Sequence, residues 1–180
     1  MADLIESRVD ELARMQSRDN GKPLPEARGL VMSAAGTARY FAAACELLEG
    51  ELPTPRQPDM LTLSRYEPLG VVAAITPWNS PIASEMQKVA PAIAAGNAVV
   101  LKPAEATPLM ALELARIFEQ AGLPAGLLSV LPGKGSVIGD ALARHPESAK
   151  NLLYRWHHHG PSSGARGGGK IDPGLAGTGR

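Results

Sequence analysis

The chain has 180 residues, enough for about one domain with a sizeable core. Hydrophobic residues make up 44% and charged residues 20%, ordinary globular values that argue against a chain disordered throughout. Eighteen basic residues balance eighteen acidic ones, and no apolar run approaches the length of a membrane span, so we expect neither nucleic acid nor a membrane as a partner. The single Cys45 excludes an internal disulfide framework and, with a charged N-terminus unlike a secretory signal, indicates a cytoplasmic location.

Glycine and charge are distributed unevenly along the chain. Residues 151–180 hold eight of the 19 glycines, four basic residues and one acidic residue, so this segment carries a net charge of +3 and residues 1–150 carry −3. Glycine makes backbone ordering costly, and few apolar side chains offset that cost here. We therefore expect a folded part at residues 1–150 and a glycine-rich tail at residues 151–180, disordered from residue 155 onward.

Two helical stretches open the chain. Apolar residues recur at helical spacing over residues 2–18, and an Asn-Gly-Lys-Pro sequence at residues 20–23 ends that stretch. A second helix is predicted over residues 26–48, followed by a strand-like segment that begins with Leu61, Leu63 and Arg65 and stops at Pro68. Cys45 lies in the second helix, where a free cysteine is most often a small core residue. No His, Asn or carboxylate partner can be argued near it, so we do not expect it to act as a nucleophile.

Strands and helices then alternate regularly. Short apolar runs at residues 71–75, 98–101 and 127–131 predict strands. Helices are predicted at residues 84–95, with a kink or break at Pro91, and at residues 135–144. A further helix begins with Thr107 as its N-cap and Pro108 at its first position, and ends at Gly122. Continuous apolar strands between helices predict an α/β fold with a parallel sheet.

Three loops follow the three predicted strands, at residues 76–79, 102–105 and 132–135. In open parallel sheets, ligands bind outside the carboxyl ends of the strands, so the loops converge on one place. Trp78 offers a flat surface, Asn79 an amide, Lys102 a charge for a phosphate or hydroxyl, and Glu105 an acceptor for a ribose. Each feature alone has a plainer interpretation as a packed indole, a solvated charge or a turn. Their occurrence at successive strand ends favours a ligand site.

Several motifs in this region carry a family resemblance. The segments EPLGVV at residues 67–72 and ITPWN at residues 75–79 are followed in order by PAIAAGN, LKPAEATP, AGLP and LPG, and DNGKP precedes them at residues 19–23. Over residues 1 to about 150 the chain resembles the aldehyde dehydrogenase superfamily. The resemblance implies part of a Rossmann-like cofactor-binding domain, with parallel strands alternating with helices and N-terminal helices before them.

The same resemblance implies the chemistry and the site. The family oxidises an aldehyde to a carboxylic acid with NAD(P)+, using a thiolate nucleophile and a glutamate base, and forms homo-oligomers. By resemblance, Asn79 is the side-chain amide of the oxyanion hole, which would stabilise a developing alkoxide. Glu105 would repel a 2′-phosphate, so NAD is expected rather than NADP. The implied cofactor-binding residues are Ile75, Thr76, Pro77, Trp78, Lys102, Glu105, Gly135 and Gly139.

Some family elements have no counterpart in these 180 residues. The nucleophilic cysteine, the ELGG motif of the general base, the projecting oligomerisation strand and the catalytic domain are not found, and we expect the sheet to lack its next strand. The chain is therefore expected to be a truncated, inactive form of an aldehyde-oxidising enzyme. The alternatives are a non-catalytic dinucleotide-binding fragment and a pseudogene-like product. The histidines at residues 157–159 lack further ligands nearby, so no metal site is expected.

The tail has an explanation at the level of codons. One permitted codon string for residues 151–160, read one base later, encodes ISFTGGTTT, and its continuation encodes a segment ending in LELGG. The family continues with FTG and ELGG elements in this order. We therefore expect a single-base frameshift near codon 150, which would account for the glycines and histidines of the tail together.

Overall fold

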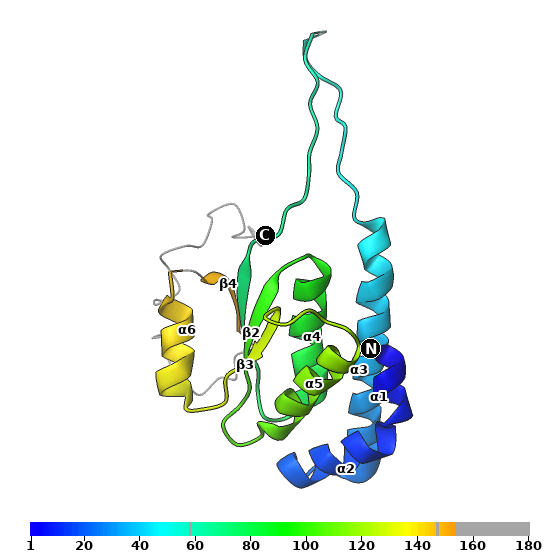
Figure 1. The fold of residues 1–180 in the computed structure, drawn as a ribbon, viewed down its shortest axis with the longest axis vertical. Helices are drawn as coiled ribbons and strands as arrows, with labels where there is room; N and C mark the ends of the chain where they lie inside the picture. Colours follow the sequence, from blue (N-terminus) through cyan, green and yellow to red (C-terminus); the bar gives the residue numbers. More distant parts are fainter. Residues whose placement is uncertain (58, 147, 154–180) are drawn as a thin grey trace, which may run out of the picture.

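The computed structural model describes residues 1–57, 59–146 and 148–153 (Figure 1). Helices α1 (Ala2–Ser7), α2 (Val9–Asn20) and α3 (Leu24–Ala44) come first, and the 3-10 turn η1 (Cys45–Leu47) follows them. The remaining elements alternate along the chain as β1 (Val71–Ile75), α4 (Pro81–Ala94), β2 (Ala98–Lys102), α5 (Leu109–Gln120), β3 (Leu128–Val130), the π-helical turn η2 (Gly135–Gly139), α6 (Asp140–Arg144) and β4 (Ser148–Leu153). The predicted α/β alternation after N-terminal helices is confirmed.

The four strands form one parallel sheet in the order β3-β2-β1-β4. Strand β4 pairs along β1, so the expectation that the sheet would lack its next strand is wrong. Strands pair through hydrogen bonds between backbone N–H and C=O groups. The free edge of β1 can therefore pair with another strand that has no family-like sequence. The boundary that we placed between residues 150 and 151 lies inside β4. The predicted disorder from residue 155 and the histidines at 157–159 lie outside the described residues.

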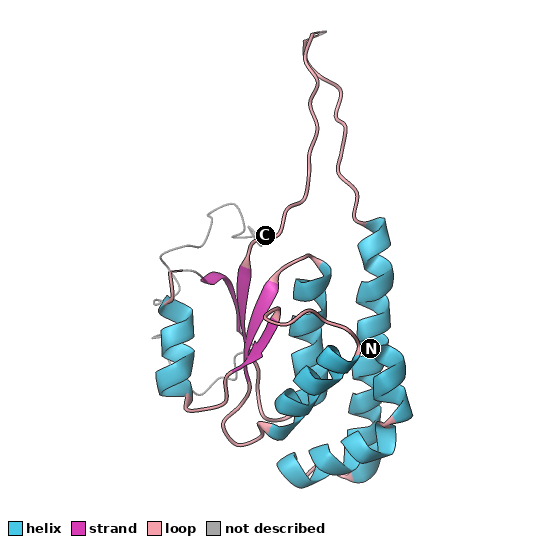
Figure 2. Cartoon of the chain, in the orientation of Figure 1, coloured by secondary structure: helices cyan, strands magenta, loops and turns pink. Residues whose placement is uncertain are grey.

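Helices lie on both sides of the sheet (Figure 2). Helices α3, α4 and α5 lie on one side and α6 lies on the other. Alternate strand residues, including Val72 in β1 and Leu101 in β2, join the core on the α4 and α5 side, together with Ile82 and Met86 of α4. Each of these four side chains is at most 2% exposed. This burial fixes the strands against the helices and sets where the strand-end loops begin.

The N-terminal region differs from the single helix predicted at residues 2–18. Arg8 leaves the helical conformation, with φ of −114° and ψ of 18°, and separates α1 from α2. Its guanidinium group donates to Glu11 at 2.6 Å and to Glu113 of α5, also at 2.6 Å. Hydrogen bonds to these carboxylates raise the Arg8 pKa above its ordinary value. The break therefore lies at a residue that connects the N-terminal helices to the sheet-covering helix α5.

A long arm, defined here as residues 48–70, projects from the body between η1 and β1 (Figure 1). Its two legs meet where the Ser64 N–H donates to the Glu51 carbonyl at 2.8 Å. The strand-like segment predicted from Leu61 up to Pro68 is wrong, because this leg forms no sheet ladder. Leu61 and Leu63 are 75% and 62% exposed. The alternating apolar pattern is present, but no layer of the body covers it.

Two predicted helix starts are also wrong. Helix α4 begins at Pro81, three residues before its predicted start, and it continues through Pro91 without the break that was one of the two alternatives there. Helix α5 begins at Leu109 without a side-chain cap, and the buried Thr107 hydroxyl has no hydrogen-bond partner. Pro91 has no N–H to donate to the Gln87 carbonyl, so it costs α4 one helical hydrogen bond even in the last turn. In the part of the chain that the structure describes, no helix is long and apolar enough to span a bilayer.

Candidate cofactor-binding site

The carboxyl ends of β1 and β2 lie side by side, which brings the first two strand-end loops together. Ile75 and Lys102 are register partners, and the Thr76 N–H donates to the Lys102 carbonyl at 3.1 Å. The loops that leave these strands therefore start at the same edge of the sheet, as predicted for parallel strands. In Figure 1 this edge is at the lower end of the sheet, where α4 and α5 begin.

Three predicted cofactor-binding residues meet at this edge. Gly139, at the end of η2, is buried, and a Cβ at this position would lie 3.9 Å from the Ile75 Cδ1 and 3.8 Å from the Lys102 Cδ. A Cβ at Gly139 would therefore be in ordinary van der Waals contact with both side chains, so the backbone of η2 lies close to this strand end. Gly135, at the other end of η2, is exposed and faces open space. The two glycines therefore differ, and only Gly139 lies against the sheet.

Lys102 is the most constrained charge of the site. Its residue is only 3% exposed, and its Nζ donates to the Pro103 carbonyl at 2.6 Å. Burial lowers the Lys102 pKa, and the negative charge of Glu105 acts in the opposite direction. Glu105 itself is exposed in the loop after β2. The pair presents a buried ammonium group and a solvent-facing carboxylate next to the same strand end.

The loop after β1 carries the predicted aromatic and amide groups. Trp78 is 61% exposed, while Asn79 is half-buried and its Oδ1 is buried without a hydrogen-bond partner. The Asn79 carbonyl accepts a hydrogen bond from the Asn20 Nδ2 at 3.5 Å. Thr76 is buried, and its hydroxyl also lacks a partner, while Pro77 is half-buried. The loop therefore exposes a flat indole and holds polar groups whose hydrogen-bonding capacity is unused.

Sequence reasoning did not single out a buried polar group behind this loop. Gln16 is fully buried on α2, and its Oε1 accepts from the Ile82 N–H at 3.2 Å. Glu85 of α4 is 1% exposed, and neither of its carboxyl oxygens has a hydrogen-bond partner. Burial, and then the negative charge of Asp19, raise the Glu85 pKa to about 8. The sequence did contain a signal for Gln16. It lies four residues after the buried Leu12, which places a polar side chain on the apolar face of the helix.

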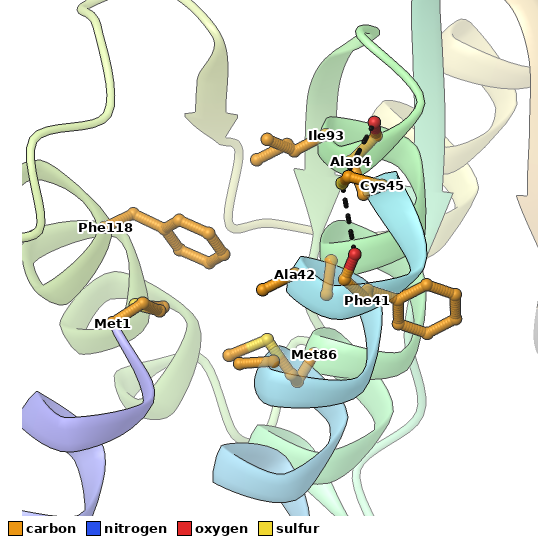
Figure 3. Close-up of a pocket in the computed structure, with 10 residues that line it drawn as sticks. Met1, Phe41, Ala42, Cys45, Met86, Ile93, Ala94 and Phe118 are labelled. Carbon is orange, nitrogen blue, oxygen red and sulfur yellow. Dashed lines mark hydrogen bonds between the residues drawn. The ribbon is translucent and has the colours of Figure 1, made fainter. Parts of the chain in front are cut away.

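Cys45 lies elsewhere, at an apolar cavity of about 180 Å³ that is lined by Met1 and by residues of α3, α4 and α5 (Figure 3). The prediction that it is a core residue is wrong, because Cys45 is exposed. Its Sγ lies 3.1 Å from the Phe41 carbonyl, and the chain turns into η1 at this residue. The cavity walls include Met86 and Phe118 and offer no charged side chain. Among the described residues, no group of three or more potential metal ligands occurs.

Comparisons with known proteins point to one family. The family model for the aldehyde dehydrogenase family matches residues 1–151. A phenylacetaldehyde dehydrogenase from Pseudomonas fluorescens is 47% identical over 156 residues, which cover 83% of this chain and 31% of that relative. An NADP-dependent enzyme from E. coli has 39% identity and a TM-score of 0.82, covering 83% of this chain and 31% of that one. An NAD-dependent aldehyde dehydrogenase from Sinorhizobium meliloti has 40% identity and a TM-score of 0.79, and the match covers 82% of this chain and 29% of that one.

These matches have two consequences. The chain spans about a third of the length of the relatives that it matches. The relatives include both NAD-dependent and NADP-dependent proteins, so the family uses a nicotinamide dinucleotide. The matching family model covers well over half of the chain, and the α/β fold agrees with the solved structures. The chain therefore belongs to the aldehyde dehydrogenase family.

Proposed function

We propose that residues 1–150 form part of the dinucleotide-binding region of an enzyme that oxidises an aldehyde to a carboxylic acid. The observation that carries the proposal is the cluster of Ile75, Lys102 and Gly139 at the carboxyl edge of the sheet. The missing side chain at Gly139 would let a nucleotide approach the backbone, and Lys102 supplies a donor at the same place. Ile75, Thr76, Pro77 and Trp78 would line the cleft, with Gly135 on the adenine side.

The preferred dinucleotide in this proposal is NAD. Glu105 is exposed next to the Lys102 strand end, where its carboxylate would accept hydrogen bonds from ribose hydroxyls. The same carboxylate would repel a 2′-phosphate, which disfavours NADP. A bound nicotinamide would supply the hydride acceptor for the oxidation. Asn79 would donate a hydrogen bond to the aldehyde oxygen as a nucleophile adds to the carbonyl carbon and the oxygen gains negative charge, which is the reason for a preorganised amide beside the cofactor.

Calorimetric titration of the 180-residue chain with NAD and with NADP tests this proposal. We expect NAD to bind, Lys102→Ala to weaken binding about tenfold, and Glu105→Gln to reduce the preference for NAD over NADP. The matched control is Glu119→Gln, because Glu119 is also an exposed acid and lies at the far end of α5. The absence of NAD binding by the unmodified chain would contradict the proposal.

We also propose that the 180 residues alone do not turn over aldehyde. The only cysteine is Cys45, which lies at the apolar cavity and not at the strand-end loops. Pure protein incubated with phenylacetaldehyde and NAD should form no NADH, and clear turnover would contradict this.

We further propose that a single-base frameshift lies near codon 150 and that the protein is cytoplasmic. Sequencing the DNA tests the frameshift, which is abandoned if the codons of residues 151–160 cannot encode FTGG in the next frame.

A further inference from the structure

The two helices that begin at the candidate site lack caps of their own. Ser80 precedes α4 and Pro108 precedes α5, and neither side chain makes a capping hydrogen bond. The first N–H groups of any helix have no partner within the helix and need one from elsewhere. These helices directly follow the strand-end loops, so fraying of either start would loosen the loop before it.

Side chains from the C-terminal half of α2 supply the missing caps. Gln16 accepts from the Ile82 N–H of α4 at 3.2 Å, and Asp19 accepts from the Leu109 N–H of α5 at 3.2 Å. Gln16 and Asp19 are three residues apart, which places them on one face of the helix. Asn20 extends the same arrangement by donating to the Asn79 carbonyl at 3.5 Å.

Burial and charge strengthen this arrangement. Gln16 is fully buried, so its hydrogen bond to Ile82 is not in competition with bulk water. The carboxylate of Asp19 lies at the N-terminus of α5, where the helix dipole favours a negative charge. Burial raises the Asp19 pKa, while its hydrogen bonds to the Leu109 and Met110 backbone lower it. These hydrogen bonds stabilise the ionised form, which is the form that caps best.

We propose that Gln16, Asp19 and Asn20 form a bracket that positions both cofactor loops, residues 76–80 and 103–108. The three side chains are positioning residues, since they act through the backbone of α4, α5 and Asn79. The functional part of this inference rests on the proposed role of these loops in binding a dinucleotide. It assigns a role to the DNGKP segment and to Gln16, neither of which lies among the predicted site residues.

Amide hydrogen exchange of the 180-residue chain, resolved by residue, tests the bracket directly. Asp19→Ala should accelerate exchange of the Leu109 N–H about tenfold and leave the Ile82 N–H unchanged, and Gln16→Ala should do the reverse. Asp19→Ala should also accelerate hydrogen exchange of the Thr107 N–H, which donates to the Ala104 carbonyl inside the loop. Asp19→Asn keeps an acceptor oxygen and should restore protection. Arg18→Ala is the matched control, because Arg18 is exposed in the same turn.

A second measurement separates positioning from general stability. Asp19→Ala should weaken NAD binding about fivefold, Asp19→Asn should recover most of it, and Arg18→Ala should change neither. Unchanged exchange at Leu109 and Ile82 overturns the bracket, and accelerated exchange with unchanged NAD affinity overturns its positioning role. If the unmodified chain binds no NAD, the proposed function fails, while exchange at Leu109, Ile82 and Thr107 still decides whether the bracket holds the loops.

Discussion

The body and the arm contain similar apolar side chains but place them in opposite environments. Leu101 of β2 is fully buried, whereas Leu61 of the arm is 75% exposed. Both lie in short segments for which the sequence pattern predicts a strand. Leu101 has strand neighbours on both sides and helices above it, while the leg that carries Leu61 contacts the other leg of the arm near Ser64 and Glu51. Burial is therefore decided by the layers that surround a segment, and its alternating pattern alone does not decide it.

The largest contrast should appear when one leucine is truncated in each region. Leu101→Ala removes a fully buried side chain and should lower the free energy of unfolding by about 2–5 kcal/mol. Leu61→Ala removes exposed surface and should change it by less than about 0.5 kcal/mol. Urea denaturation of both variants measures the two values. Equal losses of stability would mean that the arm packs against the body in solution, and would contradict the contrast between the two regions.

The second contrast concerns a carboxyl group buried in the body. The Glu85 pKa is raised from its ordinary value of 4.5 to about 8, so the folded state retains a proton that the unfolded state releases. Stability from this group is complete below about pH 4.5 and declines by about 1.4 kcal/mol per pH unit up to about pH 8. Asp19, whose pKa burial also raises, contributes in the same direction.

Unfolding free energies measured between pH 5 and pH 8 check this expectation. Glu85→Gln should remove most of the decline, because glutamine does not titrate. Glu67→Gln in the exposed arm is the matched control and should keep the full decline. The same slope in both variants would show that Glu85 is not the group responsible.

The smallest contrast uses two glycines. A Cβ at Gly133 would lie 2.5 Å from the Ile138 Cδ1, and its φ of 148° disfavours a side chain, so Gly133→Ala should cost about 1 kcal/mol. A Cβ at Gly50 in the arm would lie even closer, 2.1 Å from the Ser64 carbonyl oxygen. Gly50→Ala should nevertheless cost less, because the legs of the arm can separate without disturbing the core. Thermal unfolding of the two variants compares them, and a larger loss for Gly50→Ala would contradict this view.

The sequence predicted the strands β1, β2 and β3 and the convergence of the loops that follow β1 and β2, because continuous apolar runs are local signals and the ends of parallel strands meet at one edge. It did not predict β4, since the pairing of residues 148–153 depends on a free edge far away in the chain. It also missed the caps of α4 and α5. A Thr-Pro pair is a good local start signal, but the partner of the Leu109 N–H is Asp19, ninety residues earlier.

That separation also has a kinetic consequence. The hydrogen bonds from Gln16 to Ile82 and from Asp19 to Leu109 join residues 66 and 90 positions apart. Closing such loops carries an entropic cost that must be met before the contacts form, and contacts of high sequence separation slow folding. During synthesis, α2 emerges well before either helix that it caps. We therefore expect the loops at residues 76–80 and 103–108 to become ordered late in folding, after α5 has joined the N-terminal helices.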